Sequence, residues 1–70
     1  MQIQKPMARK VQKMDGNKWV DVPFEQLKLG DKFRFVDKNG KASNVYEATS
    51  NPIPPGSPEG NEDAWIIKIL

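Results

Sequence analysis

Short extended runs separated by turn-forming residues make up the first third of the chain. Val20, Val22 and Phe24 occupy every second position, which is the period of a strand with one buried face. The pair Asp15-Gly16 stands between this run and the extended segment before it. Such a pair favours a tight hairpin, because its glycine accepts the positive φ that the turn requires. The pattern therefore predicts a β-hairpin centred on Gly16.

One helical turn and three further strands are predicted for the rest of the chain. Residues 24–29 are too few for a stable helix and indicate a single helical turn. Residues 37–40 predict a second hairpin turn, because they end in an Asn-Gly pair. Strands are expected on either side of that turn and near residue 70, over residues 32–36, 41–49 and 64–70. In the last strand, Trp65, Ile67 and Ile69 should face the core.

The opening segment supports more than one interpretation. Met7, Val11 and Met14 recur at helical spacing, but few residues separate Met7 from the turn at Asp15. We expect an extended strand that leads into the hairpin, with a helix or a disordered arm as the alternatives. Residues 1–6 are expected to form a disordered arm.

These elements predict an all-β fold: a small antiparallel SH3-like barrel or roll of four to five strands with one short helical turn. A chain of 70 residues has room for one domain, which we place at residues 7–70. Nearly all apolar residues are needed for packing, because neither a disulfide nor a metal is available to stabilise the fold. We therefore expect a binding surface in preference to a deep catalytic pocket.

Residues 50–63 differ in composition from the rest of the chain. They hold four of the six prolines, and three acidic residues against no basic one, which is typical of an extended surface loop. Ile53 is expected to be exposed near the tip of this loop, where it would contact another protein. The residues predicted to bind that protein are Ile53, Pro54, Pro55, Glu59 and Glu62.

The composition argues against catalysis and against a bound metal or cofactor. Cys and His are both absent, so thiolate chemistry and the commonest general base are excluded. The three serines stand in turn or loop contexts with no histidine to activate them. Glu59, Glu62 and Asp63 lie close together in the sequence, but their spacing does not match a calcium loop. We predict a non-enzymatic protein with no metal and no cofactor.

Apolar runs are short throughout the chain. The longest, residues 64–67, falls far below the roughly 20 residues that a membrane helix needs. No apolar stretch near residue 1 has the length of a signal peptide. We expect no membrane partner and a cytoplasmic location.

Basic residues are concentrated at one end of the chain. Residues 1–18 hold five basic residues and one acidic residue, a net charge of +4, whereas residues 19–70 hold six and eight, a net charge of −2. A basic arm can bind a phosphate backbone through counterion release, and exposed aromatic rings can stack on bases. The residues predicted for this alternative are Lys5, Arg9, Lys10, Lys13, Trp19 and Tyr46.

Residues 22–34 resemble a signature of small, mostly uncharacterised phage and prophage proteins, F-x-x-L-x-x-G-D-x-F-R. Its fixed positions are filled here by Phe24, Leu27, Gly30, Asp31, Phe33 and Arg34. The Ala-Thr-Ser-x-Pro segment at residues 48–52 and the tryptophan of the last strand extend the likeness. The resemblance implies expression in the cytoplasm of an infected or lysogenic bacterium. It also implies, by analogy with other phage proteins of this size, binding to a host protein that is inhibited or modulated.

Three functional hypotheses follow. The first is a non-enzymatic, phage-like protein-binding module whose partner is a protein. The second is a weak nucleic-acid binder that uses the basic N-terminal residues. The third is a homo-oligomer, such as a homodimer, that sequesters a small molecule at its subunit interface.

Overall fold

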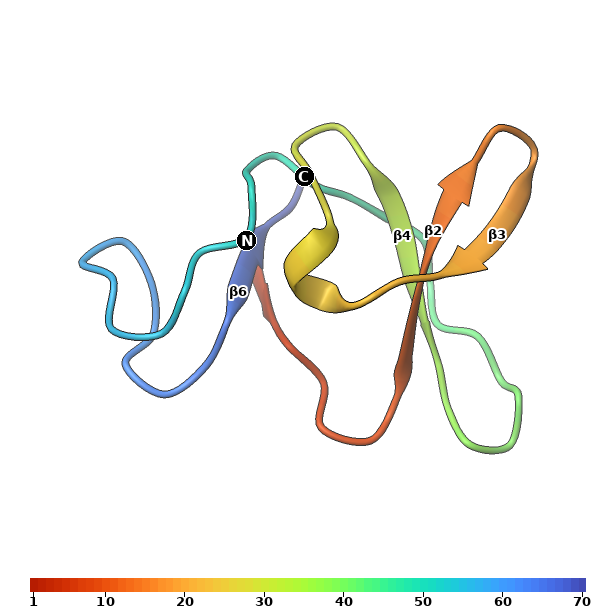
Figure 1. The fold of residues 1–70 in the computed structure, drawn as a ribbon, viewed down its shortest axis with the longest axis horizontal. Coiled ribbons are helices and arrows are strands. Elements are labelled where there is room, and N and C mark those ends of the chain that lie inside the picture. Colours follow the sequence, from red (N-terminus) through yellow and green to blue (C-terminus); the bar gives the residue numbers. More distant parts are fainter.

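Two antiparallel sheets and one short helical turn make up the fold (Figure 1). A computed structural model describes residues 1–70. The larger sheet has the strand order β3-β2-β4-β5, and the smaller sheet pairs β1 with β6. In chain order the elements are β1 (Gln2–Gln4), β2 (Lys10–Asp15), β3 (Lys18–Asp21), η1 (Phe24–Gln26), β4 (Lys32–Val36), β5 (Tyr46–Glu47) and β6 (Ile66–Lys68). The predicted all-β antiparallel fold is confirmed, with six strands where four to five were expected.

The first predicted hairpin is formed by β2 and β3. Gly16 lies in the turn with a φ of 67°, a conformation that glycine adopts without a steric penalty. Beyond the end of β3, the N–H of Val22 donates a hydrogen bond to the carbonyl of Val11 over 2.9 Å. The segment before the turn is a strand, in agreement with the extended interpretation of that segment and not with the helical one.

The helical turn η1 directs two apolar side chains into the core. Phe24 and Leu27 are each 1% exposed, and the N–H of Leu27 donates to the carbonyl of Phe24 over 3.2 Å. The carboxylate of Asp31 accepts a hydrogen bond from the N–H of Lys28 over 2.9 Å. A polar side chain thus closes the turn just before β4 begins, as an Asp at a turn commonly does.

The strand after the second turn is shorter than predicted. Only Tyr46–Glu47 pairs regularly with β4, whereas a strand was predicted over residues 41–49. At Ser43, the hydroxyl Oγ accepts the N–H of Phe35 over 2.9 Å, and the N–H of Ser43 donates to the carbonyl of Phe35 over 2.8 Å. A side chain here replaces the backbone acceptor of a regular ladder, because serine competes for backbone hydrogen bonds.

Residues 2–4 form a strand, in contrast to the disordered arm predicted for residues 1–6. Ile3 lies opposite Ile67 in the antiparallel pair of β1 and β6, and the N–H of Ile69 donates to the carbonyl of Met1 over 2.9 Å. The physical reason is that β6 is an apolar strand that needs a partner along its edge. That partner is more than sixty positions away in the sequence, so no local signal marks it.

The Pro-rich segment at 50–63 folds back on β6, and the prediction that Ile53 is exposed was wrong. Ile53 is 7% exposed, and it exchanges two backbone hydrogen bonds with Ile66, of 2.8 and 3.1 Å. This pairing runs along an edge of β6 and places the side chain of Ile53 beside that of Ile66, on the face of β6 that points away from the main core. Both Ile66 and Ile67 are therefore fully buried, although they lie on opposite faces of one strand.

The main core lies between the two sheets. Its members are Val11, Phe24, Leu27, Phe33, Phe35, Ala48, Ile67 and Ile69. Side chains alternate across a strand, so the residues between the core positions of β2 and β4 point to the opposite face of the larger sheet. We call this the outer sheet face, and none of its residues is fully buried.

Candidate interaction surface

The outer sheet face carries mostly polar side chains around one tryptophan. The strand register places Gln12 of β2 between Asp21 of β3 and Arg34 of β4, and it places Met14 opposite Trp19. By alternation with the core positions, the residues of this face are Lys10, Gln12, Met14, Trp19, Asp21, Lys32, Arg34, Val36 and Glu47.

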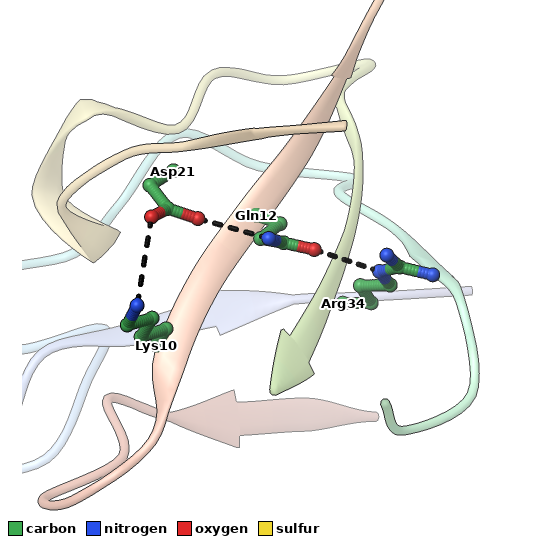
Figure 2. Close-up of polar contacts among 4 residues, drawn as sticks. All are labelled: Lys10, Gln12, Asp21 and Arg34. Carbon is green, nitrogen blue, oxygen red and sulfur yellow. Dashed lines mark hydrogen bonds and ion pairs between the residues drawn. The ribbon is translucent and has the colours of Figure 1, made fainter. Parts of the chain in front are cut away.

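A chain of polar contacts crosses three strands of this face (Figure 2). Arg34 Nε donates to Gln12 Oε1 over 3.0 Å, and Gln12 Nε2 donates to Asp21 Oδ1 over 2.9 Å. The other carboxylate oxygen, Asp21 Oδ2, lies 3.9 Å from Lys10 Nζ. Gln12 accepts on one side and donates on the other, so its amide orientation is determined by both neighbours.

Arg34 is held on a second side by an aromatic ring. Its guanidinium carbon lies 4.3 Å from the centroid of the Trp19 ring, within the distance of a cation–π contact. Both Arg34 and Trp19 are half-buried, and Arg34 Nε is the only atom of the side chain with a hydrogen bond in the protein. The two terminal nitrogens, Nη1 and Nη2, keep their donors for an external acceptor. A planar guanidinium fixed in this way is suited to bidentate recognition of an anion.

The basic residues predicted for nucleic-acid binding do not form one free arm. Lys5 Nζ pairs with Glu25 Oε2 at 2.8 Å, and Lys10 takes part in the contacts of the outer sheet face. The guanidinium of Arg9 lies 4.7 Å from the centroid of the Phe35 ring. These cations are already engaged with acidic or aromatic groups of the protein.

The pair of Lys5 and Glu25 has an electrostatic consequence. The hydrogen bond from Lys5 is the main cause that lowers the pKa of the Glu25 carboxyl below its ordinary value of 4.5. A backbone hydrogen bond and the charge of Lys5 act in the same direction, and burial opposes them. Both residues line a cleft of about 430 Å³ between the chain before β2 and the segment after β3.

The remaining residues predicted for nucleic-acid binding are separated by the sheet. Lys13 lies opposite Phe33 and Val20, on the core side of the larger sheet, and is half-buried. Tyr46 is also half-buried, with its ring 5.7 Å from that of Phe33. Among the predicted residues, the structure brings only Lys10 and Trp19 together on the outer sheet face.

The residues predicted for protein binding in the Pro-rich segment have two outcomes. Pro54, Pro55, Glu59 and Glu62 are exposed, whereas Ile53 is buried against β6. The exposed members are prolines and acids, and no large apolar side chain accompanies them. The segment is therefore accessible but lacks the anchor that Ile53 was expected to supply.

Sequence reasoning missed Gln12, Asp21 and Arg34 as members of one surface. The signal that could have found them is the hairpin register, because a two-residue turn after Asp15 places Asp21 opposite Gln12. The pairing of β2 with β4, which adds Arg34, involves residues far apart in the sequence and leaves no such signal.

The one helical element, the three-residue turn η1, is far too short to span a membrane. Comparison of the chain with protein-family models, with curated proteins and with solved structures found no match.

Proposed function

We propose that this chain is a non-catalytic protein-binding module, and that its partner contacts the outer sheet face around Trp19 and Arg34. The observation that carries this proposal is the arginine that is stacked on a tryptophan and also tethered through Nε. Tryptophan and arginine are the residues most enriched among those that dominate the free energy of protein association. Held in one orientation, they lose little conformational entropy when a partner binds.

The surface contributes little to the stability of the fold, which supports a role in binding. An exposed cation–π contact contributes roughly 0.5–1 kcal/mol. The pair of Lys10 and Asp21 is exposed at 71% and 59% of its side chains, and pairs of this kind contribute about 1 kcal/mol or less. The half-buried side chain of Met14, which lies opposite Trp19, adds contact area beside the tryptophan.

Protein is favoured over nucleic acid because of how the cations are used. Counterion release requires cations that are free to approach phosphates, and Lys5 and Lys10 are already paired with acidic groups. The expected stacking ring of Tyr46 packs against Phe33 and Phe35. The phage setting and a bacterial host protein as target remain predictions from the resemblance at residues 22–34.

A pull-down from bacterial lysate tests the proposal. Tagged wild-type protein should retain a stoichiometric protein band after nuclease treatment. Arg34→Gln and Trp19→Ala should each lose that band, because they remove the fixed guanidinium or the ring that supports it. Lys41→Gln is the matched control, since Lys41 is an exposed cation outside the outer sheet face.

Two outcomes would refute the proposal. A band that survives both substitutions would show that the partner does not use this surface. Loss of all bound material on nuclease treatment would show that the ligand is nucleic acid. Circular dichroism of each variant would establish that the substituted proteins remain folded.

A further inference from the structure

We infer that the outer sheet face receives an extended acidic segment of the partner, which pairs with the free edge of β3 and places a carboxylate on the terminal nitrogens of Arg34. The inference rests on the proposed function and names the chemistry of the partner at that same surface.

The edge of β3 carries unpaired backbone groups. β3 is the first strand in the order β3-β2-β4-β5, so only one of its edges is bonded. Hydrogen-bonded pairs alternate along an antiparallel ladder, and the bond from Val22 to Val11 fixes which residues face β2. The residues whose N–H and C=O point away from the sheet are Trp19 and Asp21. These groups form a template for an added strand.

An extended peptide satisfies this edge better than a nucleic acid does. The edge presents both donors and acceptors, at Trp19 and at Asp21. A peptide backbone supplies both kinds of partner in the spacing of a strand, whereas a phosphate backbone supplies acceptors only. Pro23 has no N–H, so it ends the pairing and limits the added strand to a few residues.

The guanidinium of Arg34 lies farther into the outer sheet face than that added strand. Arg34 belongs to β4, two strands away, but its guanidinium carbon is 4.3 Å from the ring centroid of Trp19, which is a residue of β3. A strand added beside β3 would lie about 4.8 Å from it. The acidic side chain that reaches Nη1 and Nη2 is therefore carried by residues of the segment that follow its paired part and cross the outer sheet face above Trp19.

Charge on the surface selects an acidic side chain. The acidic group nearest to Arg34 in the network, Asp21, is already bonded to Gln12 and paired with Lys10. Asp21 therefore does not compete for the guanidinium. Lys18, on β3 itself, has no ion pair in the protein, whereas Lys32 lies two strands away on β4, opposite Glu47. The guanidinium and Lys18 together complement a negatively charged segment.

Selection from a display library of random linear peptides against the immobilised full chain tests this inference. The enriched peptides should share a short extended pattern of β-branched residues with Asp or Glu at one position. In ¹⁵N NMR spectra, the enriched peptide should shift the backbone amides of Trp19 and Asp21 and the Nε–H signal of Arg34. Arg34→Lys keeps the charge but loses the planar pair of donors, so it should weaken binding roughly tenfold or more.

The controls separate this inference from the proposed function. The same peptide with Gln or Asn in place of its acid should bind more weakly to wild-type protein, and Lys41→Gln should bind the original peptide normally. Enriched peptides that share no acidic position, or that bind Arg34→Lys unchanged, would overturn the carboxylate contact while the pull-down still decides the proposed function. Peptide binding that leaves the amide signals of Trp19 and Asp21 unshifted would overturn the edge pairing. Failure of the selection to enrich any peptide would overturn an extended segment as the ligand. A single-stranded oligonucleotide that shifts these same signals equally well would overturn the choice of a peptide.

Discussion

Replacing Gly60 by alanine should destabilise the protein only while Ile53 keeps its side chain. A Cβ atom at Gly60 would lie 2.8 Å from Cγ2 of Ile53 and 3.5 Å from two side-chain carbons of Ile66. Overpacking of this kind costs about 1–3 kcal/mol. Alanine also restricts the unfolded chain, which offsets about 0.4–1 kcal/mol of that cost. We expect Gly60→Ala to lower the free energy of unfolding by about 1 kcal/mol.

The partner substitution removes the atom responsible for the clash. Ile53→Ala deletes three buried carbon groups at about 0.8 kcal/mol each and leaves a small cavity, a loss of about 3 kcal/mol in total. A chain of 70 residues is stable by roughly 7 kcal/mol, so this variant still folds. In that background the Cβ at Gly60 fills empty space, and Gly60→Ala should be neutral or stabilising. The coupling energy between the two substitutions should be about 1–2 kcal/mol.

Urea unfolding followed by tryptophan fluorescence measures the four free energies of the cycle. Gly56→Ala is the matched control from the same segment: its φ of 83° strains an alanine, but nothing lies within 4 Å of the added Cβ. It should destabilise wild type and Ile53→Ala equally. If the Gly60 and Ile53 substitutions prove additive within about 0.5 kcal/mol, the packing of residues 50–63 on β6 is refuted.

Three further perturbations address the turn, the ion pair and the first strand. Gly16→Ala places a Cβ at a φ of 67° and should lower the free energy of unfolding in urea by about 1–2 kcal/mol, and Gly16→Asn should lower it less. Equal stability of wild type and both variants would contradict the turn geometry. Because the pKa of Glu25 is lowered in the folded state, its contribution to stability is present above pH 4.5 and is lost as the pH falls through the lowered pKa. Glu25→Gln should therefore lower the free energy of unfolding by less than about 1 kcal/mol at pH 7, since both partners are partly exposed. At low pH the variant and wild type should have the same free energy of unfolding. A difference that stays constant across the titration would exclude the pair with Lys5 as the cause. Deleting residues 1–4 removes β1 and exposes the edge of β6, so size-exclusion chromatography should show self-association, and a stable monomer would argue against the pairing.

Local signals predicted the hairpins and the helical turn well. Asp15-Gly16 marked the turn between β2 and β3, and the short run of residues 24–29 indicated the single helical turn η1. These features depend on residues within a few positions of one another, where turn chemistry and side-chain period decide the conformation.

Pairings between distant residues were missed for a common physical reason. The burial of Ile53 and the strand at residues 2–4 both depend on β6. Ile53 pairs with Ile66, and residues 2–4 pair with β6 from the opposite end of the sequence. A proline-rich composition also favours a loop without showing whether the loop packs against the body. The candidate site was not predicted for the same reason, because Arg34 contacts Gln12 only through the long-range pairing of β2 with β4.

The pairing of β1 with β6 brings the first and last strands of this sequence together, and Figure 1 shows the two termini near each other. This strand pair closes a loop that contains nearly all of the chain, so the entropy of closure opposes it until the intervening elements have collapsed. Contacts of such long range slow folding. The smaller sheet should therefore assemble late, and β6, with its buried isoleucines, remains exposed until then. The interval before β1 docks is consequently the stage of folding at which the protein is most vulnerable to aggregation.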